Sequence, residues 1–199
     1  MSGHWAPAWR READVGEAAG TGRGTAVVLM GVSGCGKSRI GSELAARLGW
    51  PMVEGDALHP ESNVAKMAAG TPLTDGDRRP WLEAVRDRLD AEAATGPVVV
   101  VSCSSLKRAY RDLLRTASAR VVFIELDVAR SELARRVSGR RGHFMPVSLL
   151  DSQLATLEPL ALDEDGRRVA SHQDPRRTLE EVVAAVGGLM ACEEDAPSA

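Results

Sequence analysis

The chain has 199 residues, 44% of them hydrophobic and 27% charged, which is ordinary for one globular domain with its own core. The formal net charge of −3 argues against nucleic-acid binding, since domains that bind nucleic acids usually carry a basic excess. No apolar run approaches the roughly 20 residues that cross a bilayer, so we expect no membrane span. Three cysteines without metal-ligand spacing and a charged N-terminus indicate a reduced, cytoplasmic setting rather than secretion.

Apolar runs and helical patterns alternate between two tails. Residues 1–23 and 191–199 show no apolar periodicity and are predicted to be disordered, which leaves 24–190 as one domain. Strands are predicted at 26–30, 52–53, 98–101 and 121–126, with a weaker one at 168–170, and helices at 37–48, 61–69, 79–93, 106–116, 129–137, 147–157 and 176–190. Continuous β-branched runs such as 98–101 are typical of strands buried on both faces. We therefore expect an α/β fold of three layers, with a central parallel sheet between helices.

The first predicted strand leads into a phosphate-binding loop. The sequence GVSGCGKS matches the pattern G-x-x-x-x-G-K-[ST], with a strand before it and a helix after it, as the pattern requires. Backbone N–H groups of such a loop and of the following helix surround phosphate oxygens. The residues expected to bind a nucleoside triphosphate are Gly31, Val32, Ser33, Gly34, Cys35, Gly36, Lys37 and Ser38. Lys37 is expected to reach the β- and γ-phosphates, and Ser38 to bind Mg²⁺.

Ligands of open α/β sheets bind beyond the carboxyl ends of the strands, so the residues that follow each strand are candidates for the site. Asp56 follows the second strand in a Gly-Asp turn. Its carboxylate either accepts a proton from a substrate hydroxyl or helps to position Mg²⁺, unless it only caps the next segment. His59 either hydrogen-bonds a substrate or satisfies a turn.

A helix start is predicted near Asp77, which fits the N-cap, with Pro80 in the first turn. The aspartates of this segment are explained at least as well by helix capping as by function. Arg78 differs, because a guanidinium beside the cleft can hold a carboxylate with two hydrogen bonds.

Two further segments concentrate positive charge. Lys107 and Arg111 are four residues apart and are expected to project from one helix face, where two cations repel unless an anion lies between them. Asp112 could partly fill that place, but we favour anion binding. Residues 133–150 carry several arginines and no acidic residue, which predicts a lid that closes over phosphates; the alternative is a solvated basic loop.

Together these segments resemble the gluconokinase family, the small P-loop kinases that phosphorylate gluconate. The matches are GVSGCGKS at 31–38, EGDALHPESNVAKMAAGTPLTDGDRRPWL at 54–82, CSSLKRAYRDLLR at 103–115 and GRRGHFMPVSLLDSQLATLEPL at 139–160. The second match is far more specific than the phosphate loop, and it separates this family from its shikimate and adenylate kinase relatives.

The resemblance implies a nucleoside-monophosphate-kinase-like core with an arginine-bearing lid. It implies transfer of the γ-phosphate of ATP, with Mg²⁺, to the 6-hydroxyl of D-gluconate, with Asp56 as the base or a hydroxyl ligand. The implied lid clamp consists of Arg136 and Arg140, and the implied ligands of the sugar acid or its carboxylate are Lys66, Arg78, Lys107 and Arg111. Members of the family are often dimers, although no interface can be read from this sequence.

The sequence departs from the family pattern at three places, one of which is an N-terminal tail without a family counterpart. Ser105 stands where the family usually has alanine, and residues 161–175 fit the family's last strand poorly. One alternative function is a P-loop kinase for another small acid, such as shikimate or a different aldonate. Another is a non-catalytic nucleotide switch, but guanine-reading switches need an N-K-x-D segment that this sequence lacks, and its D-x-x-G segment at 163–166 lies beyond the lid.

Overall fold

A five-stranded sheet forms the centre of the computed structural model, which describes residues 24–138 and 148–194. The strands are β1 (Thr25–Met30), β2 (Met52–Glu54), β3 (Val98–Ser102), β4 (Arg120–Asp127) and β5 (Gly166–Ala170). Their spatial order is β2-β3-β1-β4-β5, and every neighbouring pair is parallel. The parallel sheet and the weakly predicted fifth strand are thereby confirmed.

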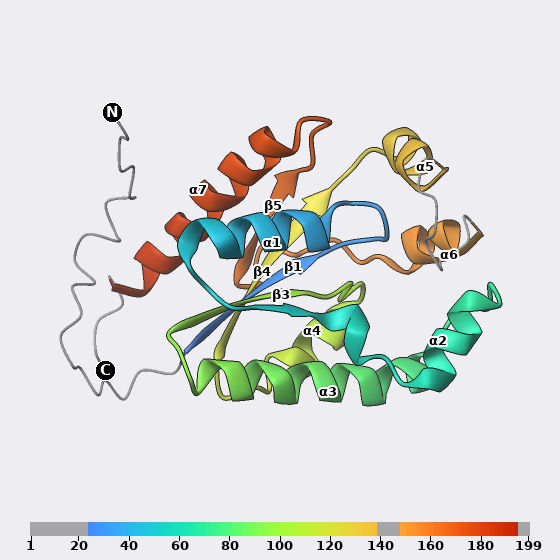
Figure 1. Cartoon of the computed structure of the whole chain (residues 1–199), viewed down its shortest axis with the longest axis horizontal. Coiled ribbons are helices and arrows are strands. Elements are labelled where there is room, and N and C mark those ends of the chain that lie inside the picture. The colour runs from blue at the N-terminus through green and yellow to red at the C-terminus, as the bar shows by residue number, and fades with distance from the viewer. Residues whose placement is uncertain (1–23, 139–147, 195–199) are drawn as a thin grey trace.

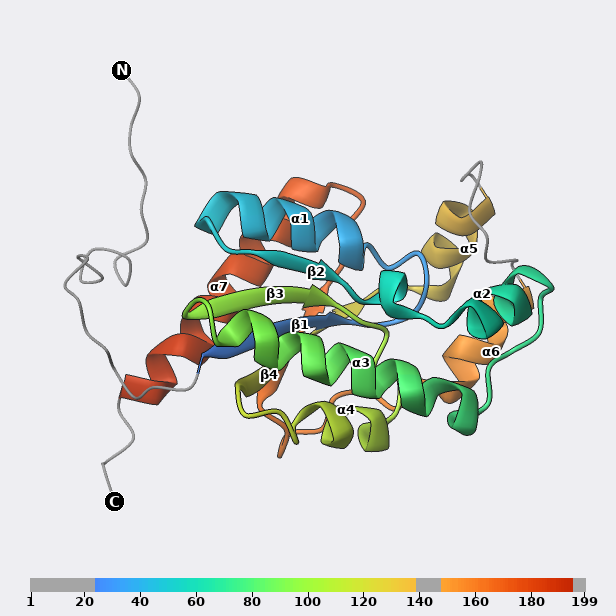
Figure 2. The ribbon, with the colours of Figure 1, turned by 60° about the horizontal axis from the view of Figure 1, so that its bottom comes forward.

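Helices cover both faces of the sheet, as a three-layer α/β fold requires. They are α1 (Lys37–Leu48), α2 (Glu61–Ala68), α3 (Asp75–Ala93), α4 (Arg108–Leu114), α5 (Arg130–Ser138), α6 (Ser148–Thr156) and α7 (Pro175–Glu194), with a short 3₁₀ helix, η2, at Gly55–Leu58. Helices α1 and α7 lie on one face, and α3 and α4 on the other (Figures 1 and 2). Helices α2, α5 and α6 gather at the end of the sheet where β1 runs into the phosphate loop. Within the described ranges, no helix combines the length and apolar character needed to span a membrane.

Alternate residues of each inner strand contribute to two separate cores. Val27 and Leu29 of β1 pack beneath α1 and α7, whereas Val28 and Met30 pack on the other side with Trp81 and other residues of α3. Successive side chains of a strand point to opposite faces, so a strand covered on both sides must be apolar throughout. This requirement accounts for the unbroken apolar runs from which the strands were predicted.

Helix α3 begins earlier than the sequence predicts. Its N-cap is Thr74, whose hydroxyl accepts a hydrogen bond from the Asp77 amide (3.2 Å), while the Asp77 carboxylate accepts one from the Thr74 amide (2.9 Å). This reciprocal pair is a capping box, so the prediction that Asp77 is the N-cap is wrong, and Pro80 lies inside the helix. The segment Thr-Asp-Gly-Asp offers several capping side chains, and sequence alone did not rank them.

Gly55 allows the end of β2 to lie directly against the end of β3. A Cβ atom added to Gly55 would lie 2.3 Å from the carbonyl oxygen of Ser102, which is closer than any real contact. The missing side chain therefore brings η2, which carries Asp56, against the carboxyl end of β3.

We predict that Gly55→Ala lowers the free energy of unfolding by about 1–3 kcal/mol, because the added methyl group must displace backbone. Gly76→Ala is the matched control, since a Cβ there meets only the Thr74 hydroxyl at 3.8 Å, an ordinary contact. Urea denaturation of both variants measures the difference. Equal stability of the two variants would contradict the assigned role of Gly55.

Candidate active site

The phosphate loop joins β1 to α1 through glycines in left-handed backbone conformations. The φ angle is +131° at Gly31, +85° at Gly34 and +107° at Gly36, a region that residues with a Cβ atom rarely adopt. The Lys37 ammonium is buried and donates to the carbonyl oxygens of Gly31 (3.0 Å) and Val32 (3.1 Å). These carbonyls are neutral acceptors, so an arriving phosphate can replace them as the partner of the lysine.

Two neighbouring hollows share residues at this loop. Lys37 and Asp56 line both a small hollow beside the loop, together with Ser38, and a larger cleft of about 690 Å³. The predicted residues His59 and Arg78 also line the larger cleft. The structure thus brings together the phosphate loop and three of the predicted substrate-binding residues.

The walls of the larger cleft combine apolar surface with a few polar groups. Trp81 of α3 is buried, and the ring of His59 stacks on it with a centroid separation of 4.1 Å and an interplanar angle of 15°. Burial lowers the pKa of His59; the nearby Asp56 carboxylate acts in the opposite direction, and Arg78 lowers the pKa further. His59 therefore faces the cleft as a neutral ring at neutral pH.

The two lysines implied for the sugar acid are paired with aspartates of α3 instead. The Lys66 ammonium lies 2.6 Å from a carboxylate oxygen of Asp77, and the Lys107 ammonium 2.8 Å from one of Asp75. Hydrogen bonds from Lys66 and then from Thr74 lower the pKa of Asp77 to about 2, and those from Lys107 and Tyr110 lower the pKa of Asp75. Neither lysine is among the residues that line the larger cleft. Their partners are carboxylates, so a substrate carboxylate would have to displace an existing ion pair.

Arg78 lines the cleft, and among the described residues its guanidinium forms no ion pair with a carboxylate. Its guanidinium donates to the carbonyl oxygen of Leu73 (2.5 Å) and lies 5.8 Å from the centre of the Tyr110 ring. Like Lys37, it holds a neutral carbonyl rather than a carboxylate. This leaves Arg78 as the predicted cation best placed to receive a carboxylate in the cleft.

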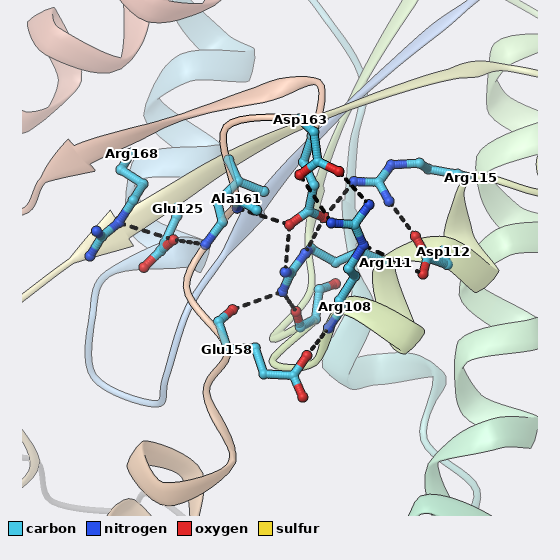
Figure 3. A network of polar contacts seen from close by, with 12 residues as sticks. Arg108, Arg111, Asp112, Arg115, Glu125, Glu158, Ala161, Asp163 and Arg168 are labelled. Carbon is cyan, nitrogen blue, oxygen red and sulfur yellow. Dashed lines mark hydrogen bonds and ion pairs between the residues drawn. The ribbon is translucent and has the colours of Figure 1, made fainter.

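Arg111 does not project toward a ligand beside Lys107, contrary to the prediction. Its side chain is 1% exposed, and it binds both carboxylate oxygens of Glu164 at 2.7 Å. The remaining nitrogen donates to the carbonyl oxygens of Ser105 (3.1 Å) and Glu158 (3.0 Å), so the guanidinium ties α4 to the loops at 105 and 158–164 (Figure 3). Lys107 is only the N-cap of α4, and the shared helix face that the spacing predicted does not form.

The acidic partner of Arg111 is held in its charged form. Burial alone would raise the pKa of Glu164, but hydrogen bonds from Arg111, from the Ala161 amide and from Arg115 lower it to about 2. A buried ion pair with all its polar atoms satisfied is costly to break, because one charge is then left unpaired. Arg111 is therefore a structural residue that holds the cleft loops together.

Arg136 of α5 lies beside the phosphate loop, whereas Arg140 falls outside the described residues. The Arg136 guanidinium donates to the Ser171 hydroxyl (2.9 Å) and to the carbonyl oxygen of His172 (2.8 Å), and it pairs with Glu132 (2.7 Å). A third hollow, of about 850 Å³, lies between Arg136, the loop glycines and the 171–175 segment after β5. The segment after residue 160, which fitted the family pattern poorly, thus forms a strand and then one wall of this hollow.

Gln153 of α6 is a candidate that the sequence reasoning did not single out. Its side-chain oxygen accepts a hydrogen bond from the Ser33 amide of the phosphate loop at 2.6 Å, and the residue also lines the larger cleft. The segment DSQLATLEPL was matched as a whole, without a role for any one side chain. The contact spans 120 positions of sequence, so no local pattern could have revealed it.

The fold and the phosphate loop define the class of the protein, a P-loop kinase. A family model described as an AAA domain matches residues 27–160. The shikimate kinase of Aquifex aeolicus vf5 superposes with a TM-score of 0.57 at 16% sequence identity, covering 82% of this chain and 96% of that chain. At this identity the similarity shows the shared fold alone, and it confirms the predicted three-layer architecture.

More similar proteins identify the family within this class. The gluconokinase of Gluconobacter oxydans (strain 621H) is 50% identical over 157 residues, which cover 79% of this chain and 88% of that protein. The crystal structure of a gluconokinase from Sinorhizobium meliloti 1021 superposes with a TM-score of 0.74 at 45% identity, covering 84% of this chain and 94% of that chain. The chain belongs to the gluconokinase family, as the motif resemblance predicted.

We predict that Arg111→Met lowers the free energy of unfolding by about 3–5 kcal/mol, because it leaves the buried Glu164 carboxylate unpaired. The control is Arg108→Met on the same helix as Arg111. It removes an exposed ion pair between Arg108 and Asp163 and should change stability little.

The variant Glu164→Gln extends the test to the pH dependence of stability. The wild-type advantage over this variant should be complete above pH 4.5, the ordinary pKa of glutamate, and should shrink as the pH falls toward 2, because the folded-state pKa is lowered. Urea unfolding across this range measures both effects, and a pH-independent difference would contradict the assigned charge of Glu164.

Proposed function

We propose that the protein transfers the γ-phosphate of ATP to the 6-hydroxyl of D-gluconate, yielding 6-phospho-D-gluconate and ADP. The observation that carries the proposal is that Lys37 and Asp56 line both the hollow at the phosphate loop and the larger cleft. A phosphate held by the loop would therefore lie next to an acceptor held in the cleft. The gluconokinase names of the relatives supply the identity of the acceptor.

The triphosphate would bind along the loop from residue 31 to residue 38. The Lys37 ammonium would exchange the carbonyl oxygens of Gly31 and Val32 for the β- and γ-phosphates. A phosphate oxygen would likewise replace the Gln153 oxygen as the acceptor of the Ser33 amide. In both cases the reason is that a charged acceptor binds an N–H group more strongly than a neutral one. Arg136 and, as a further proposal, Arg140 would neutralise negative charge on the transferring group. The nucleoside would lie in the third hollow, against the 171–175 segment.

Mg²⁺ fits the side chains of the small hollow. The ion prefers oxygen ligands and usually keeps several waters, and the Ser38 hydroxyl and the Asp56 carboxylate line the same hollow. When bound, the ion supplies charge neutralisation on the phosphates. The residues of the chain supply the remaining contributions, which are the positioning of the acceptor and the removal of its proton.

Gluconate would lie in the larger cleft with its carboxylate on Arg78 and its terminal hydroxyl near Asp56. In transfer, the hydroxyl proton moves to the Asp56 carboxylate while the oxygen forms a bond to the γ-phosphorus and the bond to the bridging oxygen of ADP breaks. We propose that Lys66 and Lys107 act indirectly. Their ion pairs with Asp77 and Asp75 hold the first turn of α3, on which Arg78 lies.

The activity itself is tested with purified protein, ATP and Mg²⁺, offered D-gluconate, other aldonates and shikimate in parallel. We expect D-gluconate to be the preferred acceptor, with phosphorylation at carbon 6 detected by NMR of the product. Preference for shikimate would overturn the substrate assignment, and ATP binding without transfer to any acceptor would favour a nucleotide switch.

We predict that Asp56→Asn lowers kcat by about 10²–10⁴-fold, the usual contribution of a positioned base, with little change in the Kd for ATP. Asp87→Asn, an exposed aspartate of α3 paired with Arg86, is the control and should leave kcat unchanged. Steady-state kinetics with an ATP-binding titration measure the two quantities. Unchanged turnover in Asp56→Asn would remove this carboxylate from the mechanism.

We predict that Arg78→Met raises the KM for gluconate by about 10- to 100-fold, because a charge-assisted hydrogen bond to the carboxylate is lost. The neighbouring Arg79→Met is a matched control, since Arg79 is exposed and paired with Glu83. D-Glucitol has the same chain of hydroxyls without the carboxylate. If Arg78 binds the carboxylate, the two variants should phosphorylate D-glucitol at similar rates, and a selective loss with D-glucitol in Arg78→Met would point to another role.

A further inference from the structure

The ring of His59 is held in one plane at the wall of the cleft. It stacks on Trp81, and Trp81 is itself fixed because it is 1% exposed and its indole N–H donates to the carbonyl oxygen of Gly55 at 2.8 Å. Stacking fixes the plane of the ring but not the direction of its two edges, because a half-turn about the Cβ–Cγ bond leaves the plane unchanged. Which ring nitrogen carries hydrogen therefore depends on the neighbours at the ring edge.

Asn63 is the neighbour that determines the hydrogen positions. Its side chain is buried, and its amide nitrogen donates to the carbonyl oxygen of Asp77 at 2.8 Å. A backbone carbonyl can only accept, so the nitrogen of the Asn63 carboxamide, and not its oxygen, must face Asp77. The same nitrogen lies 3.4 Å from Nδ1 of His59. It has one hydrogen left for this contact, so Nδ1 must be an unprotonated acceptor.

The charges around the ring also favour the neutral form. Asp56 of η2 stabilises an imidazolium, whereas Arg78 of α3 opposes it and burial disfavours it further. The Lys37 ammonium lines the same cleft and adds positive charge there. A protonated ring would also place an N–H group at Nδ1 against the N–H group of Asn63. In the neutral ring with a bare Nδ1, the hydrogen is on Nε2.

We propose that His59 is a neutral hydrogen-bond donor, which presents its Nε2–H to a hydroxyl oxygen of the sugar acid, and that Asn63 is the positioning residue that holds it in this form. Among the described residues, Nε2 has no hydrogen-bond partner, so its N–H is available to a ligand in the cleft. This inference rests on the proposed function for the identity of the ligand. It also excludes His59 as the base, because Nδ1 is occupied by Asn63 and Nε2 already carries hydrogen; the proton of the acceptor must then go to Asp56.

The tautomer is tested on the full-length protein without ligand, with ¹⁵N in the histidine rings. The chain has four histidines, and the signals of His59 are those lost in His59→Gln. We expect a protonated Nε2 and a bare Nδ1 at neutral pH, persisting below pH 6.5, the ordinary pKa of histidine. An Nδ1–H tautomer or an imidazolium at neutral pH overturns the proposal. Because no substrate is needed, this result stands whether or not gluconate is phosphorylated.

Two pairs of variants separate positioning from a structural role. Asn63→Asp replaces the donor by a carboxylate, so the pKa of His59 should rise in an NMR titration and kcat/KM for gluconate should fall about tenfold, with the KM for ATP unchanged. His59→Leu should cause a similar loss, and His59→Gln, which retains an N–H donor, should recover most of it. Equal losses in His59→Gln and His59→Leu would show that donation is not the role of the ring. If Asn63→Asp does not fold, the wild-type ¹⁵N spectrum still tests the tautomer, and the comparison of His59→Gln with His59→Leu still tests hydrogen-bond donation.

Discussion

The active site depends on one topological constraint, that all five strands run parallel and end at the same edge of the sheet. The end of β1 supplies the phosphate loop, the end of β2 supplies Asp56, and the end of β3 leads into the loop at 103–107. These ends are joined by backbone contacts: the Gly31 amide donates to the carbonyl oxygen of Ser104 (3.2 Å), and Gly55 packs on Ser102. Segments distant in sequence therefore meet as one surface, as expected at the carboxyl edge of an open α/β sheet.

The partners of the cations separate those that stabilise the fold from those that are available to a ligand. Of the cations predicted at the cleft, Lys66, Lys107 and Arg111 each pair with a carboxylate, whereas Lys37 and Arg78 donate to backbone carbonyls of the described residues. Arg136, beside the phosphate loop, has both kinds of partner, the Glu132 carboxylate and the carbonyl oxygen of His172. A carbonyl is neutral, and an anion replaces it readily as the partner of a cation; displacing a carboxylate costs an existing ion pair. The chain is acidic and has to bind two anions. Of the predicted cations that the structure describes, Lys37 at the phosphate loop and Arg78 in the cleft are those whose charge is not already compensated by a carboxylate.

Neutral polar groups complete the site where further charge would be unfavourable. Asp56 and Arg78 shift the pKa of His59 in opposite directions. Stacking on Trp81 and the contact with Asn63 hold the His59 ring so that its Nε2–H is the donor toward the cleft. Gln153 similarly places a neutral carboxamide on the phosphate loop. Such groups recognise hydroxyls and phosphate oxygens by direction rather than by charge, which suits a polyhydroxy acid.

Local sequence was sufficient for the elements whose signals are local. The phosphate loop and its flanking strand and helix were predicted correctly, because glycine conformation, apolar runs and helical periodicity act over a few residues. The weakest strand, β5, lies at the edge of the sheet, and within it only Gly166 and Val169 are buried, so its apolar run is short. The start of α3 was misplaced because several capping side chains compete within four residues.

Tertiary structure alone decided the partners of Arg111 and His59, which lie far from them in the sequence or depend on a residue that does. The spacing of Lys107 and Arg111 predicted a shared anion site, but Glu164, 53 positions beyond Arg111, takes that guanidinium into the interior. The tautomer of His59 likewise depends on the Asp77 carbonyl, 14 positions beyond Asn63, which orients the Asn63 amide. Sequence by itself thus determined the fold class, the phosphate loop and the family, since these depend on neighbouring residues. The roles of individual charges depended on contacts across the fold, because an ion pair or hydrogen bond forms with whatever the packed chain brings within about 3 Å.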